Sequence, residues 1–138
     1  MIYVMKKILI LFLSVFTFYS CLDDDSPNVR YEFLKVDSAT TPESFTFGEV
    51  DTIKIKYTLP NSCYSFNGLY YQKVDTTRIV AGTAIVALDV ACTQDVRQEE
   101  YAFPVEATQE EDYVFKFWKG KNDEGEDVYE EVVIPVNL

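Results

Sequence analysis

The feature that most constrains the fold is the segment 52–59, in which polar and apolar side chains alternate without exception. Ile53, Ile55, Tyr57 and Leu59 fall on one side of an extended chain, and Thr and Lys residues fall on the other. A period of two is typical of a β-strand with one buried face and one face in water. The Pro-Asn-Ser sequence at 60–62 is a turn signal that ends the strand.

Further segments resemble this one in their Val, Ile, Thr, Tyr and Phe content, and none shows a helical period. The connections are short and leave no room for crossover helices, which favours antiparallel order. We therefore predict an all-β domain over residues 30–138, an immunoglobulin-like antiparallel β-sandwich of about 7–8 strands. A small β-barrel or jelly roll is the alternative. The further strands are predicted at 30–36, 44–47, 63–73, 77–90 with a bend at Gly82, 100–107, 113–118 and 128–136.

The first residues read as an export signal. Lys6 and Lys7 precede an apolar run at 8–18 that is too short to span a bilayer but suits the core of a secretory signal. The run ends in the sequence Phe18-Tyr19-Ser20-Cys21, which resembles a bacterial lipobox. We expect 1–20 to be a removed signal peptide, Cys21 to be lipidated, and 21–29 to be a flexible acidic tether. The alternative is a plain secretory signal with Cys21 as a free or disulfide-bonded thiol.

Three acidic residues, Asp23, Asp24 and Asp25, follow the lipidation site almost directly. This cluster resembles the surface-export signal of Bacteroidota lipoproteins. It predicts an outer-membrane lipoprotein exposed at the cell surface. A merely solvated tether on a protein that faces the periplasm is the alternative.

Composition narrows the function classes. The chain has 12 Lys and Arg against 23 Asp and Glu, a net charge of −11, and it contains no His. Such acidity argues against nucleic-acid binding, because phosphates would be repelled. The missing His removes the usual general base and the commonest zinc ligand. We expect no catalysis, no cofactor and no metal.

Two cysteines remain if Cys21 carries lipid. Cys63 and Cys92 lie at the ends of predicted strands in a protein expected to reach an oxidising compartment. We predict that they form a structural disulfide. A redox pair is the alternative, but no Cys-x-x-Cys spacing is present.

Aromatic residues divide into core candidates and one candidate binding surface. The core candidates each sit in an alternating run: Phe33, Phe45, Tyr57, Phe103, Phe115 and Phe117. The segment 63–71 gathers Tyr64, Tyr70 and Tyr71 around Asn67-Gly68, where we expect Gly68 to form a bulge. Two alternation frames coexist there, so at least one ring should face outward.

Trp118 should face away from Phe115 and Phe117, which lie in the same strand. Outward rings stack on sugars or on a partner protein. We therefore interpret Tyr64, Tyr70, Tyr71 and Trp118 as a possible binding surface. The alternative is that these rings are core or half-buried at a sheet edge.

Two acidic segments carry less information. Residues 122–127 do not meet the ligand order of a calcium loop and read as a hairpin turn around Gly125, with a weak cation site as the alternative. Residues 106–112, together with Glu130 and Glu131, read as a solvated face.

The lipobox, the acidic tether, the cysteine pair and the ending Tyr-Val-Phe-Lys-Phe-Trp-Lys-Gly-Lys at 113–121 together resemble small Bacteroidota lipoproteins of unassigned function with an immunoglobulin-like domain. The resemblance implies no catalytic residues. We expect a non-enzymatic, lipid-anchored surface protein that is a binding or accessory module for a macromolecule. A glycan-binding subunit of an outer-membrane uptake system is the alternative, ahead of a carboxylate-only enzyme or a proteinase inhibitor.

Overall fold

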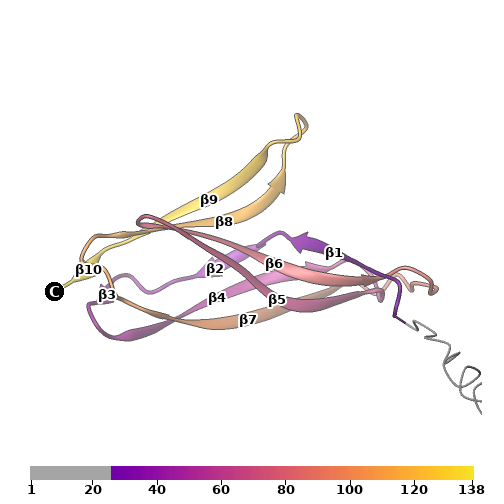
Figure 1. Cartoon of the computed structure of the whole chain (residues 1–138), viewed down its shortest axis with the longest axis horizontal. Helices are drawn as coiled ribbons and strands as arrows, with labels where there is room; N and C mark the ends of the chain where they lie inside the picture. The colour runs from indigo at the N-terminus through magenta and orange to yellow at the C-terminus, as the bar shows by residue number, and fades with distance from the viewer. Residues whose placement is uncertain (1–25) are drawn as a thin grey trace, which may run out of the picture.

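The computed structural model describes residues 26–138, in which every regular element is a β-strand (Figure 1). The predicted signal peptide, the lipidation site and the export motif lie outside the described residues. No helix in the described part is long and apolar enough to cross a membrane. The strands are β1 (Val29–Leu34), β2 (Ser38–Thr40), β3 (Phe45–Thr46), β4 (Val50–Leu59), β5 (Tyr64–Val74), β6 (Thr77–Ala87), β7 (Arg97–Glu106), β8 (Tyr113–Lys121), β9 (Asp127–Ile134) and β10 (Val136–Asn137).

The strands form a β-sandwich. One sheet contains β1, β5, β6, β8 and β9, and the opposing sheet has the order β2-β4-β7. A short pair of β3 and β10 lies at the end where the C-terminus is found (Figure 1). The prediction that the segment 52–59 is a strand with one buried face is confirmed. The inward side chains are all 2% exposed or less: Ile53, Ile55, Tyr57 and Leu59.

The five-stranded sheet forks along β6. The first part of β6, Thr77 to Val80, pairs in parallel with β8. From Gly82 to Ala87, β6 instead pairs with β1 in antiparallel order. The hairpin of β8 and β9 consequently rises away from the rest of the sheet toward its tip (Figure 1). Gly82 lies where β1 begins to replace β8, and a Cβ there would lie 3.0 Å from the Leu34 Cβ.

The prediction of a β-sandwich is confirmed, but the prediction of wholly antiparallel pairing is wrong in two places. Both β6–β8 and β3–β10 are parallel pairs. The chain leaves β6, forms β7 in the opposing sheet and returns as β8. A strand of the second layer therefore takes the place of the crossover helix that a parallel pair usually needs.

The core lies between the two sheets and contains five of the six aromatic candidates. Phe45, Tyr57, Phe103, Phe115 and Phe117 are buried. The prediction for the sixth, Phe33, is wrong, because its side chain is 54% exposed. The next residue, Leu34, takes the inward position on β1 opposite Gly82, so the ring of Phe33 faces outward.

Candidate binding groove

The bulge predicted at Gly68 is present and decides which tyrosines of β5 face outward. The β5–β6 register shifts by one position between Phe66 and Gly68, and Gly68 has a φ of 120°. Ahead of the bulge, Tyr64 packs against the core. Beyond it, Tyr70 lies opposite Ala81 on the outer face of the sheet.

A second bulge places two more rings on the same face. The β8–β9 register shifts between Trp118 and Gly120, where Gly120 has a φ of 102°. The shift sets Trp118 directly opposite Tyr129. Paired residues of an antiparallel ladder point to the same side, so both rings stand on the outer face. The prediction that Trp118 faces away from the buried Phe115 and Phe117 is confirmed.

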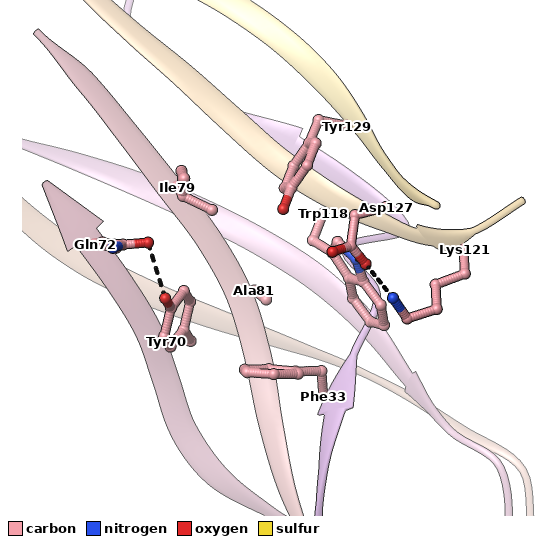
Figure 2. Close-up of a pocket in the computed structure, with 9 residues that line it drawn as sticks. All are labelled: Phe33, Tyr70, Gln72, Ile79, Ala81, Trp118, Lys121, Asp127 and Tyr129. Atoms are coloured by element: carbon pink, nitrogen blue, oxygen red, sulfur yellow. Dashed lines mark hydrogen bonds and ion pairs between the residues drawn. The ribbon is translucent and has the colours of Figure 1, made fainter. Parts of the chain in front are cut away.

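These rings line an open groove of about 230 Å³ on the outer face of the sheet, at the fork of β6 (Figure 2). The Phe33 ring lies between two others, 5.2 Å from the ring of Tyr70 and 5.9 Å from that of Trp118, centroid to centroid. The first of these contacts is edge-to-face, and the second is tilted. The full lining is Phe33, Tyr70, Gln72, Ile79, Ala81, Trp118, Lys121, Asp127 and Tyr129.

Polar groups edge the groove on two sides. The indole Nε1 of Trp118 donates a hydrogen bond of 3.0 Å to Asp127 Oδ1, and Lys121 Nζ lies 2.9 Å from the same oxygen. Lys121, and after it the Trp118 hydrogen bond, hold the pKa of Asp127 below its usual value. On the opposite side, the hydroxyl of Tyr70 donates to Gln72 Oε1 at 2.9 Å (Figure 2).

The structure brings two of the four predicted binding residues together and places the other two elsewhere. Tyr70 and Trp118 both line the groove. Tyr64 does not, because its hydroxyl donates to Glu32 Oε2 at 2.8 Å and its ring packs against the core. Tyr71 lies on the opposite side of β5 from Tyr70, next to Phe103, with 6.1 Å between ring centroids.

Tyr71 belongs to a different surface depression, and that depression is organised by a buried arginine. Arg78 is 3% exposed, its guanidinium lies 4.7 Å from the centre of the Tyr113 ring, and its Nη2 donates to Gln109 Oε1 at 2.7 Å. Burial raises the pKa of Tyr71, and the charge of Arg78 opposes that rise. Through Gln109, these contacts hold the segment that precedes β8 against β6.

Sequence reasoning missed most of the groove. The sequence pattern predicts Phe33 in the core, and it predicts no individual role for Tyr129, Asp127 or Lys121. The available signal was the hairpin centred on Gly125, which brings β9 back beside Trp118. Without the bulge at Gly120, however, that hairpin places Lys119 rather than Trp118 opposite Tyr129.

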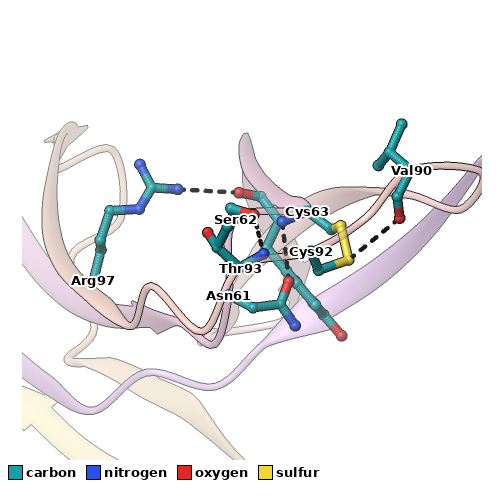
Figure 3. Close-up of a disulfide and its surroundings, with 8 residues drawn as sticks. Asn61, Ser62, Cys63, Val90, Cys92, Thr93 and Arg97 are labelled. Carbon is teal, nitrogen blue, oxygen red and sulfur yellow. Dashed lines mark hydrogen bonds between the residues drawn. A yellow bond between two sulfur atoms is a disulfide. The ribbon is translucent and has the colours of Figure 1, made fainter.

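The predicted disulfide is confirmed and lies apart from the groove. Cys63, the residue directly before β5, is bonded to Cys92 in the loop between β6 and β7, with 5.3 Å between their Cα atoms (Figure 3). The backbone N–H of Thr93 donates to Ser62 Oγ at 2.8 Å, and Arg97 Nη2 donates to the Tyr64 carbonyl at 3.3 Å. The bridge thus holds the 88–96 loop against β5.

The segment 122–127 is a hairpin turn, as predicted. Gly125 has a φ of 82°, and the Asn122 side-chain oxygen accepts hydrogen bonds from the backbone N–H groups of Glu124 and Glu126. Between residues 26 and 138, no group of three or more His, Cys, Asp or Glu side chains lies where it could hold a metal ion.

Comparison with known proteins gives one match. Residues 53–131 match the model of the ORF11 beta-sandwich domain. No curated protein and no solved structure matches the chain. The matched stretch reaches from β4 into β9 and includes every groove residue except Phe33. Since it covers more than half of the 138 residues, the chain belongs to the ORF11 beta-sandwich domain family.

Proposed function

We propose that the chain is a non-enzymatic, lipid-anchored protein of the outer membrane, exposed at the cell surface, that binds a macromolecule through the outer-face groove. The observation that carries the binding part of this proposal is the cluster of half-exposed rings on the outer face of a sheet whose inner face already packs against the core. Phe33 is 54% exposed, Tyr70 37% and Tyr129 38%. A lone domain gains nothing from leaving such rings in water, whereas aromatic residues in a shaped depression are the usual anchors of an interface.

The chemistry of the groove favours binding over catalysis. Asp127 is the only carboxylate in the lining, and its lowered pKa keeps it ionised at neutral pH. A general acid needs a raised pKa, and an effective general base needs one nearer the operating pH. Asp127 is instead occupied by Lys121 and Trp118, an arrangement that fixes the positions of the Trp118 ring and the Lys121 ammonium.

The proposed anchor would keep the groove close to the membrane. Cys21 precedes Val29, the first residue of β1, by about eight positions. A fully extended chain of that length spans at most about 28 Å. Phe33 lies on the same strand and lines the groove, so a tether of this length would keep the groove near the lipid surface.

The anchor and the location are tested in cells. Metabolic labelling with an alkyne-bearing palmitate should mark the protein, and Cys21→Ala should lose the label. Replacing Asp23, Asp24 and Asp25 with Ala should leave the label in place and protect the protein from protease added to intact cells. Label that persists in the Cys21 variant would refute the anchor, and equal shaving of both proteins would refute the export role of the acidic run.

The contact surface is tested by cross-linking in native membranes followed by capture. Tyr70→Ala should lose the captured partner. Tyr101→Ala is a matched control, because Tyr101 is also 37% exposed and also contacts one ring, that of Phe66 at 5.0 Å, but it stands on β7 in the other sheet. Equal capture by both variants would place the binding surface elsewhere.

A further inference from the structure

The backbone beneath the groove has little to offer a bound peptide. β6, which supplies the floor residues Ile79 and Ala81, is paired with β5 on one side and with β8 and then β1 on the other. The Trp118 carbonyl, at the fork, accepts a hydrogen bond of 2.8 Å from the backbone N–H of Val36. An extended peptide gains affinity by pairing its main chain with a free edge, and its amides would lack such partners here.

The side chains, by contrast, match a ligand that has an apolar face and a polar rim. Ring faces carry a negative quadrupole that attracts polarised C–H groups, and the floor between the rings is made of Ile79 and Ala81. Both contacts to Asp127 go to Oδ1, so Oδ2 has no hydrogen-bond partner within the described residues. The Gln72 amide accepts the Tyr70 hydroxyl through Oε1, and its Nε2 group has no partner there either. The groove edge therefore offers one acceptor and one donor to a ligand.

Charge further restricts the ligand. Asp127 and Lys121 are the charged groups of the lining, and they neutralise one another across 2.9 Å. The chain as a whole carries a charge of −11, which repels a polyanion as it approaches. A ligand with many carboxylates, sulfates or phosphates would meet no compensating cation.

We propose that the groove binds a neutral oligosaccharide, whose sugar C–H faces pack on the rings of Phe33, Tyr70 and Trp118 and whose hydroxyls bond to Asp127 Oδ2 and Gln72 Nε2. This assignment rests on the proposed function, since it names the ligand class for the same groove. Hydroxyl groups both donate and accept, so one sugar satisfies the acceptor on one edge and the donor on the other.

The chain carries its own probe for this interaction. Trp118 is the sole tryptophan among the 138 residues, so tryptophan emission reports on the groove alone. The experiment titrates the purified full-length protein with maltoheptaose, cellohexaose, xylohexaose and mannohexaose, followed by an array of neutral glycans. Polygalacturonate and heparin serve as polyanion controls. Emission and calorimetry are both recorded.

The expected result is that at least one neutral oligosaccharide binds with a shift in Trp118 emission, and that the polyanions do not bind. Tyr70→Ala should weaken binding about tenfold or more, as expected for an aromatic anchor. Tyr70→Phe, which keeps the ring, should restore most of the affinity, and Tyr101→Ala should bind within about twofold of the parent. Melting temperatures of all variants verify that each is folded.

Three outcomes would overturn the inference. If no neutral glycan binds at millimolar concentration, the ligand class is wrong; the proposed function then survives only if membrane cross-linking captures a partner in a Tyr70-dependent manner. If a glycan binds equally to the parent and to Tyr70→Ala, the groove is not its site. If polyanions bind more tightly than neutral chains, the charge argument fails.

Discussion

The centroids of the Phe33 and Trp118 rings lie 5.9 Å apart, although the two residues are 85 positions apart in the sequence (118 − 33). They meet because β1 and β8 are successive neighbours of the same edge of β6. Where β8 departs, β1 takes its place, and the outward residues of the two strands converge over Ala81. Ala81 is only 3% exposed, although it lines the groove on the outer face.

Replacing Phe33 with Ala should uncover Trp118 without unfolding the domain. The ring is half-exposed and makes two aromatic contacts, so we expect a loss of about 1–2 kcal/mol in the free energy of unfolding. Trp118 emission in the native state should move to longer wavelength, because water reaches the indole. Urea titration followed by fluorescence measures both effects.

Phe103→Ala is the control for that experiment. Phe103 is 6% exposed and lies in the core, so its loss should cost about 3–5 kcal/mol and leave native-state Trp118 emission unchanged. A Phe33 variant with unaltered emission would mean that the two rings are not in contact in solution.

Gly68 is expected to be costly to replace, although space surrounds it. No atom lies within 4 Å of the position a Cβ would take, so the effect of Gly68→Ala is confined to the backbone, whose φ of 120° an L-residue rarely adopts. We expect a loss of about 1–3 kcal/mol in the free energy of unfolding. The neighbouring exposed Asn67→Ala should change stability by less than about 0.5 kcal/mol. Equal urea midpoints for the two variants would show that the bulge does not require glycine.

Much of the fold could be predicted from short sequence patterns and from the cysteine count. The alternation at 52–59 defines a strand with one buried face, and Gly68 beside Asn67 predicts a bulge. The two cysteines that remain after Cys21 lie at the ends of predicted strands, and they predict a disulfide. The first two patterns lie within a few residues of the structure that they predict, and the disulfide, which joins residues 29 positions apart, follows from the cysteine count.

The groove could not be predicted in the same way, because it depends on registers between distant strands. Phe33 faces outward because Leu34 takes the inward site against Gly82, a contact across nearly fifty residues of chain. Tyr129 reaches Trp118 through the bulge at Gly120, and one glycine in a strand does not say which way the register shifts. The parallel pairing of β6 with β8 is likewise decided by the passage of β7 through the other sheet.

Reduction of the Cys63–Cys92 bridge should lower stability while leaving the groove in place. The bridge closes a loop with a sequence separation of 29, for which the chain-entropy relation gives about 3.6 kcal/mol. A Cys63→Ser, Cys92→Ser double variant should show that loss in urea denaturation, and the parent should match it when reductant is added. Native-state Trp118 emission should not change, because neither cysteine lines the groove. Stability that is the same with and without reductant would exclude the bridge in solution.

The last prediction concerns alkaline pH. Tyr57 is 2% exposed and its hydroxyl donates to Glu99 Oε2 at 3.2 Å; burial first, and then Glu99, raise its pKa to about 12. In the unfolded chain its pKa is near 10. The stabilising contribution of the protonated phenol is therefore complete below pH 10, and it is lost as pH rises from 10 through 12, because only the unfolded state releases the proton in that interval.

Urea midpoints measured from pH 8.5 to 11.5 should fall steeply in the parent and less steeply in Tyr57→Phe, which has no proton to lose. Tyr64, Tyr71 and Tyr129 also have raised pKa values, so a residual slope should remain in the variant. Parallel slopes for the two proteins would show that Tyr57 is not the group whose ionisation is coupled to unfolding.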